Sequence, residues 1–202
     1  MADAPLLTGL LLAGGTSRRM EQDKTAQGFL FEGEPLAARV AARLAEACDE
    51  VVVASGDGKR MAWLGLPQVA DAIPDSGPLG GLVGGLDAAT HPHVAVVAAD
   101  MPFASPDVLR MLASRIGGRD AAVPASPRGT EPLHAVYARS VLGSFEAALR
   151  AGRLSVRVAL EGLDVLVVTE AEWSAADPSG RFAENLNRPE DREPFVERPR
   201  RN

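Results

Sequence analysis

The chain has 202 residues, of which 46% are hydrophobic and 24% are charged, and its formal net charge at pH 7 is −6. This length suffices for one hydrophobic core, so we expect a single domain over residues 1–202. The acidic balance argues against a general nucleic-acid-binding protein, which would carry a basic face, and no apolar run is long enough to span a bilayer.

The number of cysteines indicates in which kind of cellular compartment the protein works. Cys48 is the one cysteine, so an intrachain disulfide is excluded and a reducing compartment is indicated. No cationic and apolar leader precedes the first apolar run. We therefore expect a soluble cytoplasmic protein that binds neither nucleic acid nor membranes. Cys48 itself falls on the apolar side of a predicted helix, where we interpret it as a small core side chain.

The first apolar run, residues 6–13, predicts a short buried strand that stops at Gly14 and Gly15. Paired glycines accept positive φ and leave room for backbone N–H groups to approach a phosphate or a base. Arg19 and Lys24 follow as cations that could meet a bound anion. The loop matches neither the Walker motif nor the Gly-x-Gly-x-x-Gly fingerprint. An ordinary strand-to-helix turn with basic residues is the alternative.

Apolar runs then alternate with amphipathic segments along the chain. The predicted strands are residues 6–13, 51–54, 68–70, 93–99, 121–124, 131–137 and 164–169. The predicted helices are residues 35–48, 61–64, 78–89, 106–115, 141–151 and 156–160. This alternation predicts a three-layer α/β domain with a mostly parallel sheet. Pro132 lies near the start of one strand, which suits an edge strand or an antiparallel insertion. Residues 192–202 are expected to form a disordered tail.

The predicted helix at 78–89 contains four glycines, each less favourable than alanine by about 1 kcal/mol. These are Gly80, Gly81, Gly84 and Gly85. Either the sheet or a ligand must require close approach of this helix backbone. We expect both, and tight helix-to-sheet packing alone is the alternative.

Asp100 directly follows the apolar run at 93–99. The carboxyl ends of strands are where open α/β sheets bind ligands. Mg²⁺ is commonly held by one or two carboxylates together with substrate phosphates, so a single aspartate would suffice. Asp100 could instead cap the next helix, but Ser105 and Pro106 already supply a cap and a first turn.

Taken whole, the segment Leu12 to Lys24, Leu-Ala-Gly-Gly-x-Ser-x-Arg-Met-x-x-Asp-Lys, resembles the signature of the molybdenum cofactor guanylyltransferases. Three later segments are similar to that family as well: Asp-x-Pro at 100–102, Pro-Leu-x-Ala-x-Tyr at 132–137 and Asn-x-Asn at 185–187. The resemblance extends over residues 6–191. It implies a Rossmann-like nucleotidyltransferase fold with an antiparallel insertion.

The resemblance also implies an activity, the transfer of GMP from GTP to the terminal phosphate of molybdenum-molybdopterin with release of pyrophosphate. Mg²⁺ would be the cofactor, bound by Asp100. The implied catalytic residues are Arg19, Lys24 and Asp100. The implied nucleotide-binding residues are Leu12, Ala13, Gly14, Gly15, Lys24, Asp71 and Asp100. Asn185 and Asn187 would contact the pterin substrate, although an Asx turn before a helix at Pro189 is the alternative for this pair.

Two residues depart from the family pattern. Glu21 stands where the family usually has glycine, and we expect it to point away from the ligand or to pair with Arg18. Ala54 stands where some guanylyltransferases have an asparagine that contacts the nucleotide. A CTP-dependent cytidylyltransferase, a sugar-phosphate nucleotidyltransferase and a non-catalytic nucleotide-binding module are the alternatives. We expect a monomer, with transient contact to molybdoenzymes or other cofactor-biosynthesis proteins.

Overall fold

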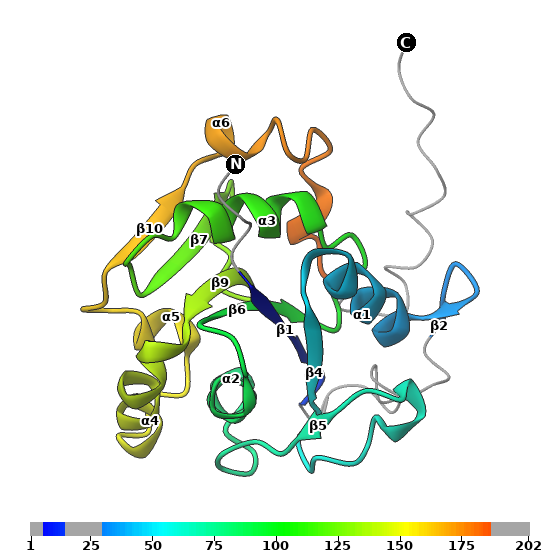
Figure 1. Cartoon of the computed structure of the whole chain (residues 1–202), viewed down its shortest axis with the longest axis vertical. Helices are drawn as coiled ribbons and strands as arrows, with labels where there is room; N and C mark the ends of the chain where they lie inside the picture. Colours follow the sequence, from blue (N-terminus) through cyan, green and yellow to red (C-terminus); the bar gives the residue numbers. More distant parts are fainter. Residues whose placement is uncertain (1–5, 15–29, 187–202) are drawn as a thin grey trace.

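The structure is a computed structural model that describes residues 6–14 and 30–186 (Figure 1). At its centre lies a sheet with the strand order β10-β7-β9-β6-β1-β4-β5, and a short β8 pairs with β7. The strands of this sheet are β1 (Leu7–Leu12), β4 (Glu50–Ala54), β5 (Gln68–Val69), β6 (His93–Ala98), β7 (Ala121–Ser126), β8 (Gly129–Thr130), β9 (His134–Ala138) and β10 (Val165–Val168). β2 (Leu30–Phe31) and β3 (Glu34–Pro35) form a separate hairpin before the first described helix.

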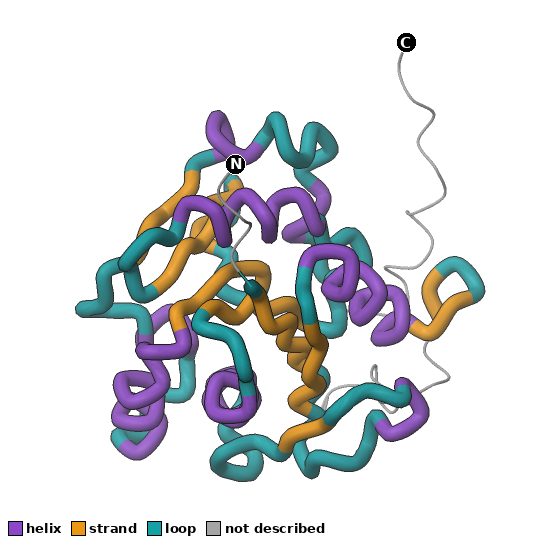
Figure 2. Tube along the Cα trace, in the orientation of Figure 1, coloured by secondary structure: helices purple, strands orange, loops and turns teal. Residues whose placement is uncertain are grey.

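Helices cover both faces of the sheet, and each face has its own buried cluster. On one face lie α1 (Leu36–Ala47), α3 (Pro106–Arg115) and α6 (Glu170–Trp173). On the other lie α2 (Pro78–Ala88), α4 (Leu142–Arg150) and α5 (Val156–Ala159) (Figure 2). Three short 3₁₀ helices complete the described chain: η1 (Ala62–Leu64), η2 (Arg139–Val141) and η3 (Arg181–Ala183). The predicted three-layer architecture is confirmed.

The sheet is mostly parallel because β1 pairs in parallel with both β4 and β6, β4 with β5, and β10 with β7. β9 is antiparallel to β6 and to β7. The antiparallel insertion is therefore confirmed and the edge-strand alternative is wrong. Pro132 lies before the first paired residue of β9, where it interrupts no ladder hydrogen bond. Its carbonyl oxygen accepts a hydrogen bond of 2.7 Å from the buried Tyr137 hydroxyl.

The glycines of α2 allow this helix to lie directly on the sheet. A Cβ atom at Gly85 would be 2.2 Å from Leu10 Cδ2, and one at Gly84 would be 2.3 Å from the Ala70 carbonyl oxygen. Neither distance is compatible with a side chain unless the helix moves away. The expectation that the sheet requires these glycines is confirmed, whereas the expected ligand contact stays a prediction.

Local signals placed several helices correctly. α3 spans the predicted residues, and the Ser105 hydroxyl accepts a hydrogen bond from the Val108 amide at 3.4 Å, as expected of an N-cap. The segment at 62–64, within a predicted helix, is a 3₁₀ turn, and a further 3₁₀ turn at 139–141 directly precedes α4. Cys48 follows α1 and is partly buried against the core, and burial raises its pKa to about 12. Its thiol is therefore neutral at pH 7, as expected of a core side chain.

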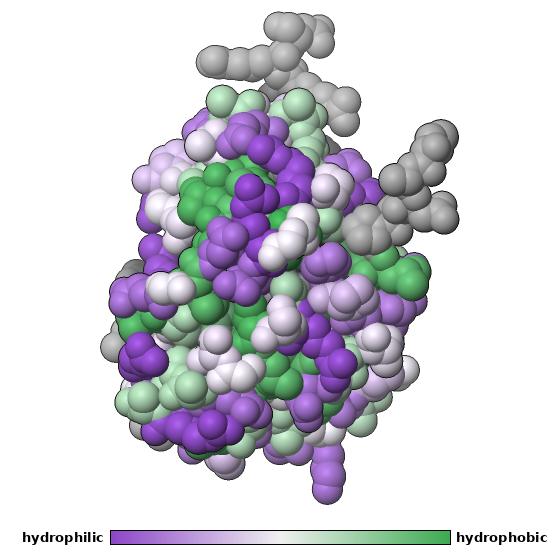
Figure 3. All heavy atoms as spheres, turned by 60° about the vertical axis from the view of Figure 1, so that its left-hand side comes forward, coloured by the Kyte–Doolittle hydropathy of each residue, from purple (hydrophilic) through white to green (hydrophobic). Residues whose placement is uncertain are grey.

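The side of the molecule on which α4, α5 and β10 lie is a mosaic of hydrophilic and hydrophobic residues (Figure 3). Large exposed apolar side chains here include Leu154 and Val167. Among the described residues, no helix combines the length and the apolar character that a bilayer crossing requires.

Candidate active site

The carboxyl ends of β1, β4, β5 and β6 meet at one edge of the sheet because these strands are parallel. The chain leaves β1 for β4 on one side and returns to β6 on the other side of β1. This reversal places the topological switch point, where such sheets bind ligands, at the end of β1. The Ala13 amide donates to the Ala54 carbonyl at 2.8 Å, and the Leu12 carbonyl accepts from the Ala99 amide at 2.9 Å.

Asp71 joins this edge from the end of β5. Its amide donates to the Gly56 carbonyl at 2.9 Å. Its carboxylate reaches the backbone after β1, since a Cβ atom on Gly14 would lie 3.0 Å from Asp71 Oδ1 and 3.1 Å from the Gly56 nitrogen. Asp71 therefore approaches the predicted nucleotide loop, whereas Asp75 lies exposed on the following loop with φ of +58°.

The carboxylate of Asp71 is desolvated at the site. Its Oδ1 atom is buried and has no hydrogen-bond partner among the described residues. Burial raises the pKa of Asp71, while the Arg60 charge and a backbone hydrogen bond from Gly56 oppose that rise. A buried acceptor without a donor is unfavourable in the protein alone, so the arrangement suits a ligand that brings N–H groups.

Asp100 follows β6 at the same edge and is partly buried. Among the described residues, no group of three or more histidine, cysteine, aspartate or glutamate side chains could hold a metal ion. The carboxylate of Asp100 nevertheless fits Mg²⁺, because this ion retains waters and takes most other ligands from nucleotide phosphates.

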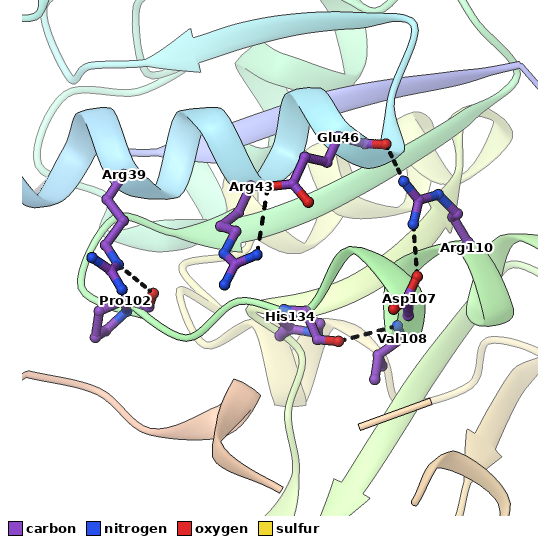
Figure 4. A network of polar contacts seen from close by, with 9 residues as sticks. Arg39, Arg43, Glu46, Pro102, Asp107, Val108, Arg110 and His134 are labelled. Atoms are coloured by element: carbon purple, nitrogen blue, oxygen red, sulfur yellow. Dashed lines mark hydrogen bonds and ion pairs between the residues drawn. The ribbon is translucent and has the colours of Figure 1, made fainter. Parts of the chain in front are cut away.

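The loop after Asp100 is held from several sides. Arg39 reaches from α1, and its Nε donates to the Pro102 carbonyl at 3.3 Å (Figure 4). The Phe103 ring packs edge-on against Phe31, with 5.6 Å between centroids. The Arg181 guanidinium lies 3.6 Å above the Phe103 ring centroid, which is cation–π geometry. The loop is therefore held by contacts from α1, from β2 and from the described C-terminal segment.

The helices behind this loop are also linked. Arg110 of α3 lies between two groups, the Glu46 carbonyl at the end of α1 and the Asp107 carboxylate, to both of which it donates (Figure 4). The contact with Glu46 joins α3 to the end of α1, whereas the pair with Asp107 lies within α3 itself.

The C-terminal described segment, residues 181–186, lies on the Asp100 loop. The Leu186 amide donates to the Asp100 carbonyl at 2.8 Å. The Arg128 guanidinium, from the turn after β7, donates to the Ala183 carbonyl. Asn185 lies between these two anchored residues, so the structure brings it close to Asp100. The alternative of an Asx turn for this pair stays a prediction, because Asn187 and the expected helix at Pro189 lie outside the described residues.

The predicted site residues Gly15, Arg19, Lys24 and Asn187 lie outside the described residues, as do Glu21, Arg18 and the residue 192–202 segment. Their expected roles stay predictions. The structure does bring together the described members of the predicted set, namely Leu12, Ala13, Gly14, Asp71, Asp100 and Asn185.

Sequence reasoning missed three residues that build the site. Phe182 is fully buried and packs on Trp173 and His134, with ring centroids 5.0 and 4.8 Å away. Arg128 anchors the C-terminal segment. No local signal marks either role, because both contacts join distant parts of the chain. His134 stands in a strand of mainly apolar residues, and this polar residue was the sequence signal that could have indicated its role.

Comparisons with known proteins agree with this geometry. A family model described as a MobA-like NTP transferase domain matches residues 9–166. The chain is 38% identical to a protein of Chloroflexus aggregans named "Probable molybdenum cofactor guanylyltransferase", over 92% of this chain and 91% of the other. It is also 38% identical to a protein of that name from Natronomonas pharaonis, covering 95% and 97% of the two chains. The crystal structure of molybdopterin-guanine dinucleotide biosynthesis protein A from Archaeoglobus fulgidus is similar with a TM-score of 0.80, 27% identity, and coverage of 93% and 95%.

Proposed function

Because the chain belongs to the MobA-like NTP transferase family, we propose that it transfers GMP from GTP to the terminal phosphate of molybdenum-molybdopterin and releases pyrophosphate. The observation that carries this proposal is the meeting of Asp71, the Leu12 to Gly14 backbone and Asp100 at the switch point of the sheet. The end of this edge at Asp71 suits a base, and the end at Asp100 suits phosphates and a metal ion.

The reaction makes modest demands on the protein. An oxygen of the acceptor phosphate attacks the α-phosphorus of GTP, a new P–O bond forms, and the bond to the β-phosphate breaks as pyrophosphate leaves. A phosphate oxygen is already anionic and needs no strong base. Rate enhancement therefore comes from aligning the two substrates and from offsetting charge on the leaving group.

Each proposed residue has a part in this alignment. Arg19 and Lys24 bind the phosphates of GTP as cations. Asp100 holds Mg²⁺, which supplies positive charge to the pyrophosphate when it is bound. Asn185 and Asn187 face the pterin substrate, which the anchoring of residues 181–186 on the Asp100 loop supports for Asn185.

Asp71 is the residue that we propose for base selection. Guanine presents two adjacent donors on its pairing edge, N1–H and the N2 amino group, and a carboxylate accepts both. Cytosine presents one amino donor beside acceptors, which a carboxylate repels. The buried and unpartnered Oδ1 of Asp71 supports GTP as the donor. The loss of an asparagine at Ala54 does not weaken this proposal, because Ala54 is fully buried and packs towards Gly81.

We propose that the enzyme works as a monomer in the cytoplasm, with transient contacts to proteins that use the cofactor. The single cysteine of the sequence, which excludes an intrachain disulfide, supports a reducing compartment.

The experiment that tests the function has two steps. Thermal stability is measured with GTP, CTP, ATP and UTP, each with and without Mg²⁺, because a ligand at a hundred times its dissociation constant adds about 2.7 kcal/mol of stability. Formation of the dinucleotide is then measured with molybdenum-molybdopterin and the nucleotide that stabilises the chain. Selective stabilisation by GTP and a GTP-dependent product are expected. Stabilisation by CTP alone would replace guanylyl with cytidylyl transfer, and no product with either nucleotide would refute the function.

A further inference from the structure

His134 is a buried polar side chain in a strand that is otherwise apolar. It belongs to β9, is fully buried, and pairs in register with Val97 of β6, three residues before Asp100. Its burial lowers its pKa to about 4, so the imidazole is neutral at pH 7. A leucine or valine would fill such a position without burying polar atoms.

One ring nitrogen of His134 has a specific partner. Nε2 accepts a hydrogen bond of 3.1 Å from the Ser105 amide, at the end of the loop that begins with Asp100. Because Nε2 is the acceptor, the proton of the neutral ring is on Nδ1. The buried Nδ1 has no hydrogen-bond partner among the described residues. An orphaned donor lowers stability, so packing alone does not account for a histidine here.

The Asp100–Ser105 loop meets His134 at one end and the C-terminal segment at the other. The Leu186 amide binds the Asp100 carbonyl at 2.8 Å, and the Phe182 ring of the same segment packs on the His134 ring. His134 thus contacts both the loop that carries the proposed metal-binding carboxylate and the segment that carries Asn185. Figure 4 shows His134 beneath this loop, near the start of α3.

We propose that His134 is a positioning residue, which holds the Asp100–Ser105 loop against the 182–186 segment and so sets the place of the Asp100 carboxylate relative to Asn185. This inference rests on the proposed function for the roles of Asp100 and Asn185. The loop contact itself is independent of them. His134 touches no reacting atom in this account, so its effect is on the order of the loop and on metal affinity.

The substitutions that test the proposal are His134→Leu and His134→Gln. Leucine removes the acceptor for the Ser105 amide while it keeps an apolar side chain. The glutamine side-chain oxygen can accept the same hydrogen bond, so this variant should recover the contact. His93→Leu is the matched control, because His93 is a partly buried histidine at the opposite end of β6 with an Nδ1 that likewise lacks a partner in the described chain.

The first readout is amide hydrogen exchange of the full chain without ligands. In His134→Leu, exchange in residues 100–105 should rise at least tenfold, while the rest of the sheet keeps its protection. His134→Gln should recover most of the protection and His93→Leu should leave it unchanged. Unchanged exchange in His134→Leu, or equal exchange in the Leu and Gln variants, would overturn the proposal.

The second readout is binding of Mn²⁺ in the presence of GTP, measured by electron paramagnetic resonance. His134→Leu should weaken Mn²⁺ binding at least tenfold, and His134→Gln should restore it. Asp100→Ala is measured alongside and tests the proposed function separately. If Asp100→Ala binds Mn²⁺ like the wild type, the metal assignment fails, and the exchange result still decides whether His134 holds the loop.

Discussion

The carboxylate of Asp71 lies against the backbone of Gly14, so closely that a Cβ atom on this glycine would be 3.0 Å from Asp71 Oδ1. The ends of β1 and β5 are thereby brought into contact across β4, which lies between them. A base seated on the backbone after β1 would therefore meet this carboxylate.

Replacing Asp71 with asparagine should weaken GTP binding at least tenfold, or about 1.4 kcal/mol. The amide offers one acceptor and a competing donor, where the carboxylate offers two acceptors. Titration calorimetry with GTP and CTP measures the effect. Asp75→Asn, on the exposed part of the neighbouring loop, is the control and should bind GTP normally. Equal GTP affinity in the Asp71 and Asp75 variants would rule out the base-reading role.

Replacing Asp100 with alanine should lower turnover at least tenfold, which corresponds to about 1.4 kcal/mol in the barrier. The reason is the loss of the proposed metal ligand. Steady-state kinetics at saturating GTP measures this change, and circular dichroism checks the fold. Asp107→Ala, at an exposed carboxylate on α3, is the matched control. Lys24→Ala should have an effect as large as Asp100→Ala. Wild-type turnover in either of these two variants would refute its catalytic assignment.

Gly85→Ala should destabilise the protein by about 1–3 kcal/mol, as expected for overpacking. The new methyl group would lie 2.2 Å from Leu10 Cδ2. Gly143→Ala, in α4, has no atom within 4 Å of the new Cβ and should stabilise the protein by up to about 1 kcal/mol. Urea denaturation of both variants gives the comparison. A stable Gly85→Ala protein would mean that α2 can move off the sheet.

The stability of the protein should fall as the pH drops from about 6.5 towards 4, because burial lowers the pKa of His134 to about 4. Over this range the unfolded chain binds a proton at His134 that the folded chain does not, so the free energy of unfolding decreases by about 1.4 kcal/mol per pH unit. Above pH 6.5 both states are neutral at this residue and its contribution is constant.

Urea denaturation between pH 4 and pH 8 measures this slope. In the His134→Leu variant, the free energy of unfolding should depend less steeply on pH, because the contribution of the His134 proton is missing. The contribution of His93 stays in both proteins, because burial lowers its pKa too. Identical slopes in the two proteins would show that His134 titrates normally in the folded state.

Much of the architecture could be predicted because its signals are local. Continuous aliphatic runs such as Val51 to Ala54 mark buried parallel strands, and Ser105 with Pro106 marks the start of α3. Asp100 could be placed at the carboxyl edge because it ends one of these runs. The family resemblance assigned Asp71 and Gly14 to the nucleotide site, and the structure shows that the two residues lie close together.

Other features depend on contacts between distant parts of the chain and could not be predicted. The central place of β9 is set by pairing with both β6 and β7, and Pro132 pointed equally to an edge. Phe182 is buried, and the Arg128 guanidinium donates a hydrogen bond to the Ala183 carbonyl. Both contacts involve residues that are far apart in the sequence, and no periodicity indicates them. The contact of His134 with the Ser105 amide is a property of the assembled loop, because the two residues are 29 positions apart in the sequence.

The central place of β9 has a consequence for synthesis on the ribosome. β1, β4, β5 and β6 are complete by residue 98, so this half of the sheet can assemble on a nascent chain. β7 is made next, but in the described sheet it reaches β6 only through β9. Until residues 134–138 emerge, β7 therefore has no strand through which it can join β6, β1, β4 and β5. The strand that joins the two parts of the sheet is therefore also the one that brings His134 to the Ser105 amide, at the end of the Asp100 loop.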